Sequence, residues 1–472
     1  MRASCSTASL RKPDAGFSAA ALAAVLFDEL RLPADARLKV GYSGGLDSHV
    51  LLHALAGLRA NHRFSLCAIH IDHGLQPASA DWGRHCARIC AALDVPYVME
   101  SIRVDGVAEE GLEAAARRAR YAAFASMLVP GDILLTAHHG DDQAETVLLQ
   151  LLRGAGVAGM AAMPAQAMIG PARIVRPMLG FTRTCLHAYA QAHQLEWVED
   201  PSNRDTHQRR NFLRTEILPR LTRYWPSPAT MLARTARHAA EAMGLLDEVA
   251  DADLGICRHA VTHSPQALSV DALTALSAPR QRNLLRYWLR QQGFLAPTTR
   301  HLDEVLGQVR SAPRSQQACV RWPGIEVWRY RNLLVAMRAQ PLPEPELVVT
   351  WNLQLPLNLP GIGRLHGVAK RGQGLSWERL GGKPLQIRLR TGGETLVLPG
   401  RRHHHALKKL LQAEGVPPWL RARLPLFYLG QELVAVADRW VSAAYRAQPD
   451  EEGMVIVWEP SVDTAEKIEN AC

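Results

Sequence analysis

Several features of other protein classes are missing from this sequence. Its eight cysteines form no C-x-x-C pair, and no apolar run approaches the length of a membrane span. We therefore expect reduced thiols, a cytoplasmic location and no membrane partner. The apolar segment 17–27 follows Arg11 and Lys12, as in a signal peptide, but it continues into Asp28 and Glu29 with amphipathic spacing. We interpret it as a first helix. Cys86 and Cys90 are interpreted as buried helix residues rather than as metal ligands.

Acidic residues are too few to balance the basic ones. The 472 residues include 54 Lys and Arg against 45 Asp and Glu, which gives a net charge of +9. Segment 364–423 holds thirteen basic residues and three acids, so it alone carries +10. This segment is either a solvated basic face or a contact surface for the phosphate backbone of a nucleic acid.

The length of the chain predicts roughly three domains. We expect helices at 231–254 and 270–291, and a β-hairpin within 319–337. A proline-rich linker at 341–345 should precede short strands and a helix at 406–414, with His403 to His405 on a loop. The predicted domains are a catalytic domain at 1–218, a helical substrate-positioning domain at 219–342, and a basic α+β domain at 346–472.

A glycine-rich stretch at 38–48 passes from an apolar strand pattern through a turn into a helical pattern. Such a corner presents backbone N–H groups and the positive end of a helix dipole to an anion. Asp47 can lie beside phosphates only if a cation such as Mg²⁺ bridges them. The loop lacks the Lys and the spacing of G-x-x-x-x-G-K-[ST], and an ordinary Gly-Gly turn would not explain its serines. We predict a nucleotide and metal site formed by Ser43, Gly44, Gly45, Leu46, Asp47 and Ser48.

Buried-type strands alternate with helices in the first domain, which predicts an α/β fold with a doubly wound parallel sheet. One strand ends at Asp72 and His73, and a later strand ends at His138. Ligands bind beyond the carboxyl ends of such strands, so these residues and the glycine-rich loop should face one pocket. For Asp72 and His73, an ordinary turn is as good an interpretation as a direct role.

An acidic cluster opens the helix that follows His138. Asp141 and Asp142 suit the helix dipole, but helical spacing also places Glu145 on the same face as Asp142. Like charges held together cost free energy unless a cation enters, and Mg²⁺, a ligand ammonium or an arginine of the chain would serve. Two other segments offer arginines for anions. Arg117 and Arg120 lie either on a solvated helix face or against a phosphate, and the run of Arg209, Arg210 and Arg214 favours an anion contact.

SGGLDS resembles the signature of the PP-loop ATP pyrophosphatases. In their order, SGGLDS, AHHGDDQAET, WVEDPSN and RRNFLR resemble the tRNA(Ile)-lysidine synthase family, and the C-terminal TGGE and LPLF are similar to that family's terminal domain. The resemblance covers most of the chain and is weakest in the middle domain. It implies a ligase that uses ATP and Mg²⁺ to attach free L-lysine to C2 of the wobble cytidine in tRNA(Ile) with a CAU anticodon. The adenylated cytidine is the implied intermediate, and the product is a tRNA that decodes AUA instead of AUG.

The same resemblance implies roles for single residues. Asp47 would lie near the metal, Asp142 and Glu145 would bind the lysine ammonium, and His138 would share in proton transfer. Arg117 and Arg210 would hold phosphate or transition-state charge, although Arg118 and Arg209 beside them blur this assignment. The basic terminal domain would position the tRNA through its phosphates.

Rival functions remain open on the sequence alone. Within the superfamily, a tRNA thiolase normally has paired cysteines near its site and an amidotransferase subunit has a glutaminase domain, and this sequence shows neither. A tRNA-binding protein without catalysis is a rival from another class, which the presence of Asp47, Asp142 and Glu145 argues against. The oligomeric state is also open, with a homodimer as one alternative.

Overall fold

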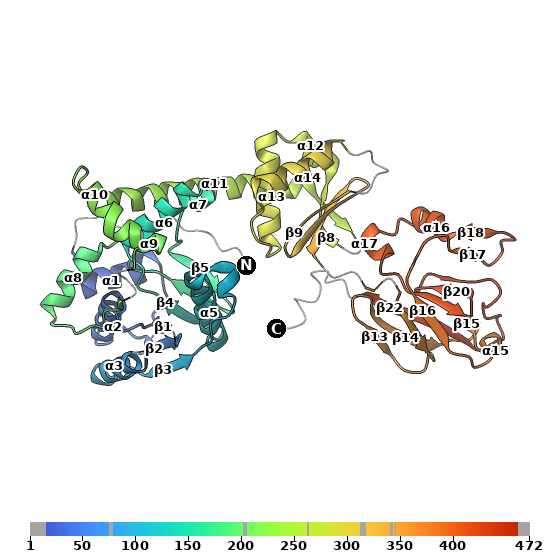
Figure 1. Ribbon diagram of the computed structural model, residues 1–472, viewed down its shortest axis with the longest axis horizontal. Helices are drawn as coiled ribbons and strands as arrows, with labels where there is room; N and C mark the ends of the chain where they lie inside the picture. The colour runs from blue at the N-terminus through green and yellow to red at the C-terminus, as the bar shows by residue number, and fades with distance from the viewer. Residues whose placement is uncertain are drawn as a thin grey trace. The chain divides into compact units, whose positions relative to one another are not determined.

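The computed structural model describes residues 16–74, 79–201, 205–261, 264–311, 318–339, 343–344 and 346–460. The chain divides into two compact units, 1–246 and 247–472. Figure 1 colours the first from blue to green and the second from yellow-green to red. Most of the predicted linker at 341–345 lies outside the described residues. Among the helices that the structure describes, none combines the length and apolar character needed to cross a membrane.

The first unit is built on a six-stranded sheet with the order β3-β2-β1-β4-β6-β5. All neighbours pair in parallel except β5, which forms an antiparallel edge. The predicted α/β fold with a parallel sheet is therefore confirmed. The strands are β1 (Arg37–Gly41), β2 (Ser65–Asp72), β3 (Tyr97–Ser101), β4 (Asp132–Leu135), β5 (Gln166–Ile169) and β6 (Ala172–Val175).

Helices cover both faces of this sheet (Figure 1) because its central strands bury alternate side chains on opposite sides. In β4, Ile133 and Leu135 join the core under α1, α2, α3 and α8, whereas Leu134 joins the core under α5. The predicted first helix is present as α1 and η1, and Cys86 and Cys90 are buried in α3 as expected. The helices are α1 (Ala19–Ala23), η1 (Ala24–Glu29), α2 (Leu46–Leu58), α3 (Ser79–Ala92), α4 (Val107–Glu110), α5 (Leu112–Met127), α6 (Gly140–Leu152), α7 (Val157–Met160) and α8 (Arg183–Ala192).

A helical run closes the first unit and leads into the long helix α11. The run consists of α9 (Arg209–Phe212), η3 (Leu213–Ile217) and α10 (Leu218–Thr222), and it is followed by α11 (Pro228–Cys257). The helix predicted at 231–254 is confirmed by α11. Ser202 and Asn203 of the WVEDPSN segment lie outside the described residues.

The middle region departs from the sequence predictions at two points. The single helix expected at 270–291 is two helices, because Leu276 and Ser277 are extended and Pro279 lies in the first turn of α13. The hairpin expected at 319–337 is three strands, because Arg331 adopts a φ of 54° and turns the chain. These strands belong to a five-stranded antiparallel sheet with the order β7-β8-β11-β10-β9. The elements are β7 (Arg258–Val261), β8 (Ser264–Ser269), α12 (Val270–Ala275), α13 (Ala278–Gln291), α14 (Thr299–Ser311), β9 (Ala318–Trp322), β10 (Ile325–Tyr330) and β11 (Leu333–Arg338).

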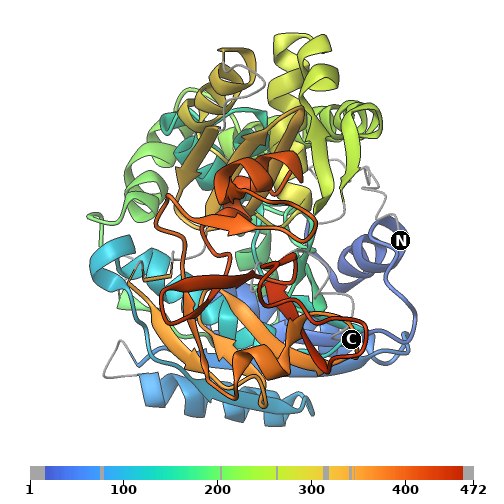
Figure 2. The same cartoon turned by 90° about the vertical axis from the view of Figure 1, so that its right-hand side faces the viewer.

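The C-terminal region is mainly antiparallel sheet (Figure 2, orange to red). Its two larger sheets have the orders β12-β16-β19-β20-β21 and β13-β14-β22-β15. The predicted helix at 406–414 is confirmed by α16, but His404 and His405 lie on strand β18 rather than on a loop, because they pair with β17. The elements are β12 (Val348–Trp351), β13 (Leu357–Leu359), β14 (Gly363–Ala369), β15 (Leu375–Ser376), α15 (Trp377–Leu380), β16 (Leu385–Arg388), β17 (Thr395–Val397), β18 (His404–Ala406), α16 (Leu407–Ala413), α17 (Pro418–Arg421), β19 (Leu426–Leu429), β20 (Glu432–Val436), β21 (Trp440–Val441) and β22 (Gly453–Pro460).

Candidate active site

The glycine-rich loop connects β1 to the N-terminus of α2. Gly44 adopts a φ of +80°, and Gly45 is the N-cap of α2 without a side-chain cap. The loop is held internally: the Ser48 hydroxyl donates to the Gly45 carbonyl at 3.0 Å and accepts from the Ser43 amide at 3.2 Å. The first turn of α2 therefore offers its N–H groups to an outside acceptor, as a phosphate site requires.

Replacing Gly44 with alanine is expected to damage this loop. The new Cβ would lie 2.8 Å from the Cys86 sulfur and would keep an alanine at a φ of +80°. We expect a loss of roughly fivefold to a hundredfold in the rate of ATP cleavage, since strain of this kind costs roughly 1–3 kcal/mol. The matched control is Gly57→Ala within α2, where nothing lies within 4 Å of the new Cβ. Equal rates of pyrophosphate release in both variants would contradict the loop assignment.

Asp47 lies in the first turn of α2 and points to the same strand edge. Its Oδ1 is buried and accepts no hydrogen bond from any residue that the structure describes. Its Oδ2 lies 3.6 Å from Nε2 of His139. A buried carboxylate oxygen without a donor fits a bound cation, so the residues present are compatible with Mg²⁺. Within the described residues no group of three or more His, Cys, Asp or Glu side chains forms a ready metal site, and the remaining ligands would be phosphate and water oxygens.

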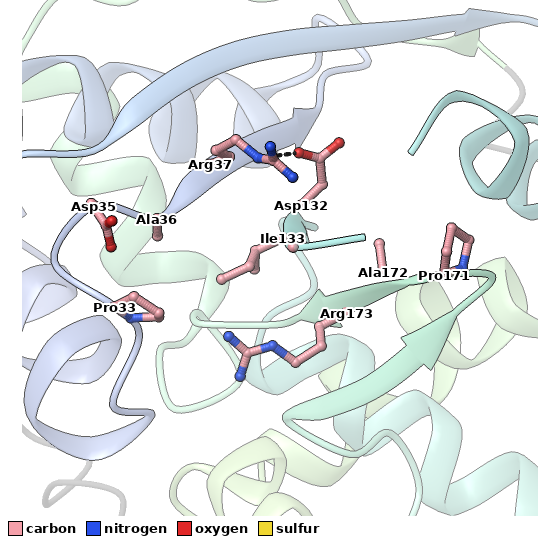
Figure 3. Close-up of a pocket in the computed structure, with 10 residues that line it drawn as sticks. Pro33, Asp35, Ala36, Arg37, Asp132, Ile133, Pro171, Ala172 and Arg173 are labelled. Atoms are coloured by element: carbon pink, nitrogen blue, oxygen red, sulfur yellow. Dashed lines mark ion pairs between the residues drawn. The ribbon is translucent and has the colours of Figure 1, made fainter. Parts of the chain in front are cut away.

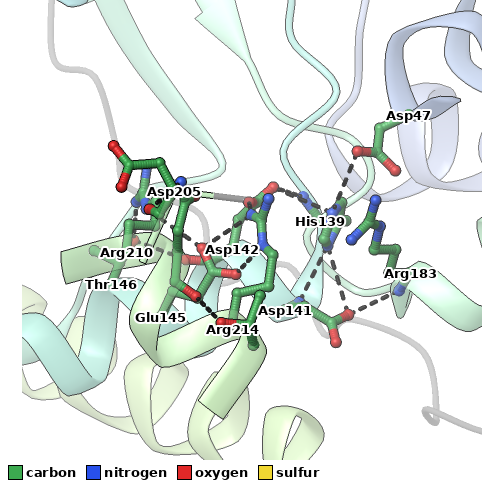
Figure 4. A network of polar contacts seen from close by, with 12 residues as sticks. Asp47, His139, Asp141, Asp142, Glu145, Thr146, Arg183, Asp205, Arg210 and Arg214 are labelled. Carbon is green, nitrogen blue, oxygen red and sulfur yellow. Dashed lines mark hydrogen bonds and ion pairs between the residues drawn. The ribbon is translucent and has the colours of Figure 1, made fainter. Parts of the chain in front are cut away.

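His139 lies among three carboxylates at the start of α6 (Figure 4). Its ring is 2% exposed and lies within 3.6 Å of Asp47, Asp141 and Asp142. Burial alone would lower the pKa of His139, but these carboxylates outweigh it and raise the pKa to about 10. His139 is therefore a buried cation at neutral pH and joins α6 electrostatically to the glycine-rich loop.

The charge on His139 predicts a pH-dependent stability for the protein without ligands. Its pKa is about 10 in the fold against an ordinary value of 6.5, so the stabilisation is complete below about pH 6.5 and disappears as the pH rises through 10. A tenfold change in proton affinity is about 1.4 kcal/mol, so the advantage of the wild type over His139→Gln should fall by several kcal/mol across this window. Urea denaturation in EDTA at several pH values measures it, and a difference independent of pH would show that His139 is neutral.

The acids of α6 already have cations from the chain. Nε and Nη2 of Arg214 donate to the two carboxylate oxygens of Glu145 at 2.6 and 3.0 Å, and Nη2 also donates to Oδ1 of Asp142 at 3.0 Å. Nε of Arg210 lies 3.3 Å from Glu145, while its Nη2 donates to the Thr146 hydroxyl. Arginines of the chain, one of the three cations considered for this cluster, therefore contact it (Figure 4).

Burial and nearby charges shift the pKa values of Asp142 and Glu145 in opposite directions. Burial alone would raise the pKa of Asp142, but the charges of His139 and Arg214 lower it below its ordinary value. Glu145 is 0% exposed, and burial raises the pKa of its carboxyl group against the opposing effect of Arg214 and Arg210. Asp142 is thus the more firmly ionised of the two, and it connects Arg214 with His139.

Comparisons with known proteins cover nearly the whole chain. Residues 20–221 match a PP-loop domain model, residues 268–335 match the TilS substrate binding domain, and residues 385–458 match the TilS substrate C-terminal domain. The tRNA(Ile)-lysidine synthase of Coxiella burnetii is 39% identical over 430 residues, which are 91% of this chain and 94% of that protein. The chain belongs to the tRNA(Ile)-lysidine synthase family. The family's proteins from Alkalilimnicola ehrlichii and Pseudomonas putida are 43% and 45% identical, over 87% and 84% of this chain and 91% of each relative.

Within this lysidine synthase fold, the arginines predicted from sequence are now separable. Arg210 contacts Glu145, whereas Arg209 is exposed. Arg117 is half-buried, with its guanidinium 5.0 Å from the centre of the Tyr121 ring, and it helps to lower the pKa of His138. Arg118 is exposed and donates to the carbonyl of Asp105. Arg210 and Arg117 are therefore less exposed than Arg209 and Arg118, and their roles stay a prediction.

His138 and Asp72 lie at the predicted strand ends but differ in environment. Nδ1 of His138 lies 2.9 Å from the Thr136 hydroxyl. Burial, with Arg176, Arg117 and Arg120, lowers the pKa of His138 to about 3 against the pull of Asp142, so the ring is neutral. Asp72 accepts a hydrogen bond from the Gly74 amide at 2.9 Å. This contact is typical of an ordinary turn, which was one of the two interpretations of Asp72 from the sequence.

His139 and Arg214 are the site residues that the sequence prediction did not select. The sequence offered one signal for His139: it directly precedes the acidic first turn of α6, as a helix-capping residue does. In the structure its amide donates to Oδ2 of Asp142 at 3.1 Å. Arg214 was one of several arginines in a run, and only the fold shows that it reaches α6. A cavity of about 380 Å³ lies elsewhere, at the amino ends of β1, β4 and β6 beside the Arg37–Asp132 ion pair (Figure 3). Because ligands bind at the carboxyl ends in such sheets, we assign the reaction to the Asp47 edge.

Proposed function

We propose that this enzyme ligates free lysine to C2 of the wobble cytidine in tRNA(Ile) with a CAU anticodon and forms lysidine. One observation carries the proposal for the site: the buried His139 contacts both Asp47, next to the uncapped glycine-rich loop, and Asp142 of α6. This arrangement offers a phosphate site and a carboxylate cluster at one strand edge, as a reaction between ATP and an amine requires.

The first step requires positions for phosphate groups. The cytidine O2 attacks the α-phosphorus of ATP, the bond to the β-phosphate breaks, and pyrophosphate leaves. Ser43, Gly44, Gly45, Leu46 and Ser48 hold the nucleotide through backbone N–H groups and hydroxyls. Asp47 would hold Mg²⁺, which when bound supplies positive charge to the departing pyrophosphate. Arg117 and Arg210 add guanidinium charge near this edge.

The second step needs lysine as a neutral amine. Asp142 and Glu145 bind the lysine ammonium in this proposal, and Arg214 contacts both of these acids in the structure. Lysine would therefore share or replace the contact between Arg214 and Asp142. The amine attacks C2 after losing a proton, and AMP leaves with the oxygen it carries. His138, which is neutral and close enough to Asp142 to be affected by its charge, would share in this transfer by relaying the proton.

The other parts of the chain would serve the tRNA. We assign catalysis to 1–218, substrate positioning to 219–342 and tRNA phosphate contacts to 346–472, where segment 364–423 carries +10. The wobble base must be unstacked for chemistry at C2. The proposal includes a homodimer, which sedimentation would test. It also includes the cytoplasm as the compartment in which tRNA and ATP meet.

The test is a lysine incorporation assay with purified protein, ATP, Mg²⁺ and a tRNA(Ile) transcript. Radiolabelled lysine should enter the RNA with equal amounts of AMP and pyrophosphate, and a transcript with U in place of the wobble C should receive none. AMP release without lysine in the RNA would assign the PP-loop chemistry to another substrate. No ATP cleavage would favour the tRNA-binding protein without catalysis.

A further inference from the structure

Exposed aromatic side chains are confined to one short stretch of the described residues. Phe212, Tyr224 and Trp225 are 43%, 79% and 53% exposed. Every other Phe, Tyr and Trp that the structure describes is buried or half-buried. A single exposed apolar residue such as Phe212 needs no explanation, but two exposed rings in contact, Tyr224 and Trp225, indicate a binding surface.

Tyr224 and Trp225 form a fixed pair at the end of the helical run α9, η3 and α10. Their ring centres are 6.1 Å apart and their planes are inclined by 59°. Both backbone amides donate to the carbonyl of Leu221, and Ser227 then turns the chain with a φ of 56° before α11. The backbone that carries the two rings is therefore tied to the helix end.

The exposed charges near these rings are mainly basic. From 209 to 225 the run contains five arginines and one acid, Glu216. Arg210 and Arg214 are paired with acids of α6, so the three exposed arginines and Glu216 leave a net charge of +2 on the exposed side of the run. Arg209, Arg220 and Arg223 are exposed, and Arg220 contacts Glu216 at 3.3 Å. Exposed aromatic rings among arginines are the combination that binds unstacked bases and the phosphates between them.

The same run also reaches the candidate active site. Arg210 and Arg214 contact Glu145 from its first half, and Trp225 follows Arg214 by eleven positions. The eight positions from Arg214 to Thr222 are helical and cover about 12 Å at roughly 1.5 Å per residue, and Tyr224 and Trp225 lie in the turn that follows α10. A chain of nucleotides leaving the reacting cytidine would therefore meet the aromatic pair just beyond the end of the same helical run.

We propose that Tyr224 and Trp225 are a stacking platform for unstacked nucleotides that flank the target cytidine of the substrate RNA. This inference rests on the proposed function for the identity of the RNA. Charge favours this occupant over a second copy of the chain, because two copies of this exposed surface, each with a net charge of +2, would repel each other.

The test is a double-mutant cycle on RNA binding by the full-length protein. Filter binding would measure the dissociation constant of a CAU anticodon stem-loop for the wild type, Trp225→Ala, Tyr224→Ala, the double variant and Trp225→Phe. Loss of stacking should weaken binding on the order of tenfold to a hundredfold in the double variant. Trp225→Phe should retain most of the affinity. Met168→Ala, which removes an exposed apolar side chain on β5, should bind like the wild type.

Stem-loops with single abasic nucleotides beside the target cytidine complete the cycle. If a ring stacks on a base, removing that base should abolish the difference between the wild type and the alanine variant. Equal affinity of all variants for intact RNA would overturn the inference, as would a penalty unchanged by every abasic substitution. A change in sedimentation without a change in RNA affinity would assign the rings to contacts between copies of the chain and also overturn it. Binding and stacking without lysine incorporation would contradict the proposed function alone.

Discussion

Replacing Asp142 with asparagine is expected to abolish lysine incorporation while tRNA binding is retained. The carboxylate of Asp142 faces two cations, because it accepts a hydrogen bond from the half-buried Arg214 at 3.0 Å and lies 3.5 Å from the buried His139. The amide keeps the shape of the side chain and removes its charge. A preorganised charge in a dry site contributes on the order of a hundredfold to a thousandfold in rate, and we expect a loss of this size.

Lysine incorporation and filter binding of tRNA measure the two halves of this prediction. The matched control is Asp81→Asn on α3, because Asp81 is also paired with an arginine, Arg84, but at an exposed position. This control should lose less than about twofold in rate, as surface ion pairs contribute little. Normal incorporation by Asp142→Asn would remove α6 from the mechanism, and a parallel loss of tRNA binding would point to a folding defect.

Replacing Glu145 with alanine is expected to destabilise the protein strongly. Glu145 is 0% exposed and receives two hydrogen bonds from Arg214 as well as the ion pair with Arg210. Removing one partner of a buried ion pair leaves charge without compensation and typically costs about 3–5 kcal/mol. The free energy of unfolding in urea should fall by about this amount.

A double-mutant cycle separates the ion pair from the loss of packing. Arg214→Met combined with Glu145→Ala should cost clearly less than the sum of the single changes, because neither charge is then left alone. Glu216→Ala is the control: its partner Arg220 is exposed, and the change should stay within about 0.5 kcal/mol. Additive effects of the two site variants would contradict the coupling seen in the structure.

The sequence was informative where one local rule decides the structure. The alternation of buried-type strands with helices predicted the parallel sheet, and the small residues at Ser43 to Gly45 predicted the loop between β1 and α2. It was less informative in the middle region. There the break before α13 and the turn at Arg331 depend on two or three residues inside long apolar patterns, which periodicity does not resolve.

In the candidate site, too, the sequence predicted what local rules determine and missed what depends on distant contacts. Asp47, Asp142 and Glu145 were predictable because strand ends and helical spacing fix their positions from nearby sequence. Arg214 was not, since it is 69 positions from Glu145 and only the packing of η3 against α6 brings it there. The charge of His139 was equally hidden. It depends first on the burial of the ring beside Asp142 and Asp141, and also on Asp47, which reaches the ring from a different helix, and neither the burial nor the contact with Asp47 can be read from the local sequence.

The most direct measurement of the central claim is a two-stage labelling experiment on the RNA. The protein is incubated with ATP labelled at the α-phosphate, Mg²⁺ and the CAU transcript without lysine, and unlabelled lysine is then added. We predict that label first appears on the RNA with release of pyrophosphate, and that lysine then releases the label as AMP while it enters the same nucleotide. Label that never reaches the RNA, although lysine is incorporated, would contradict an adenylated cytidine formed at the Asp47 edge.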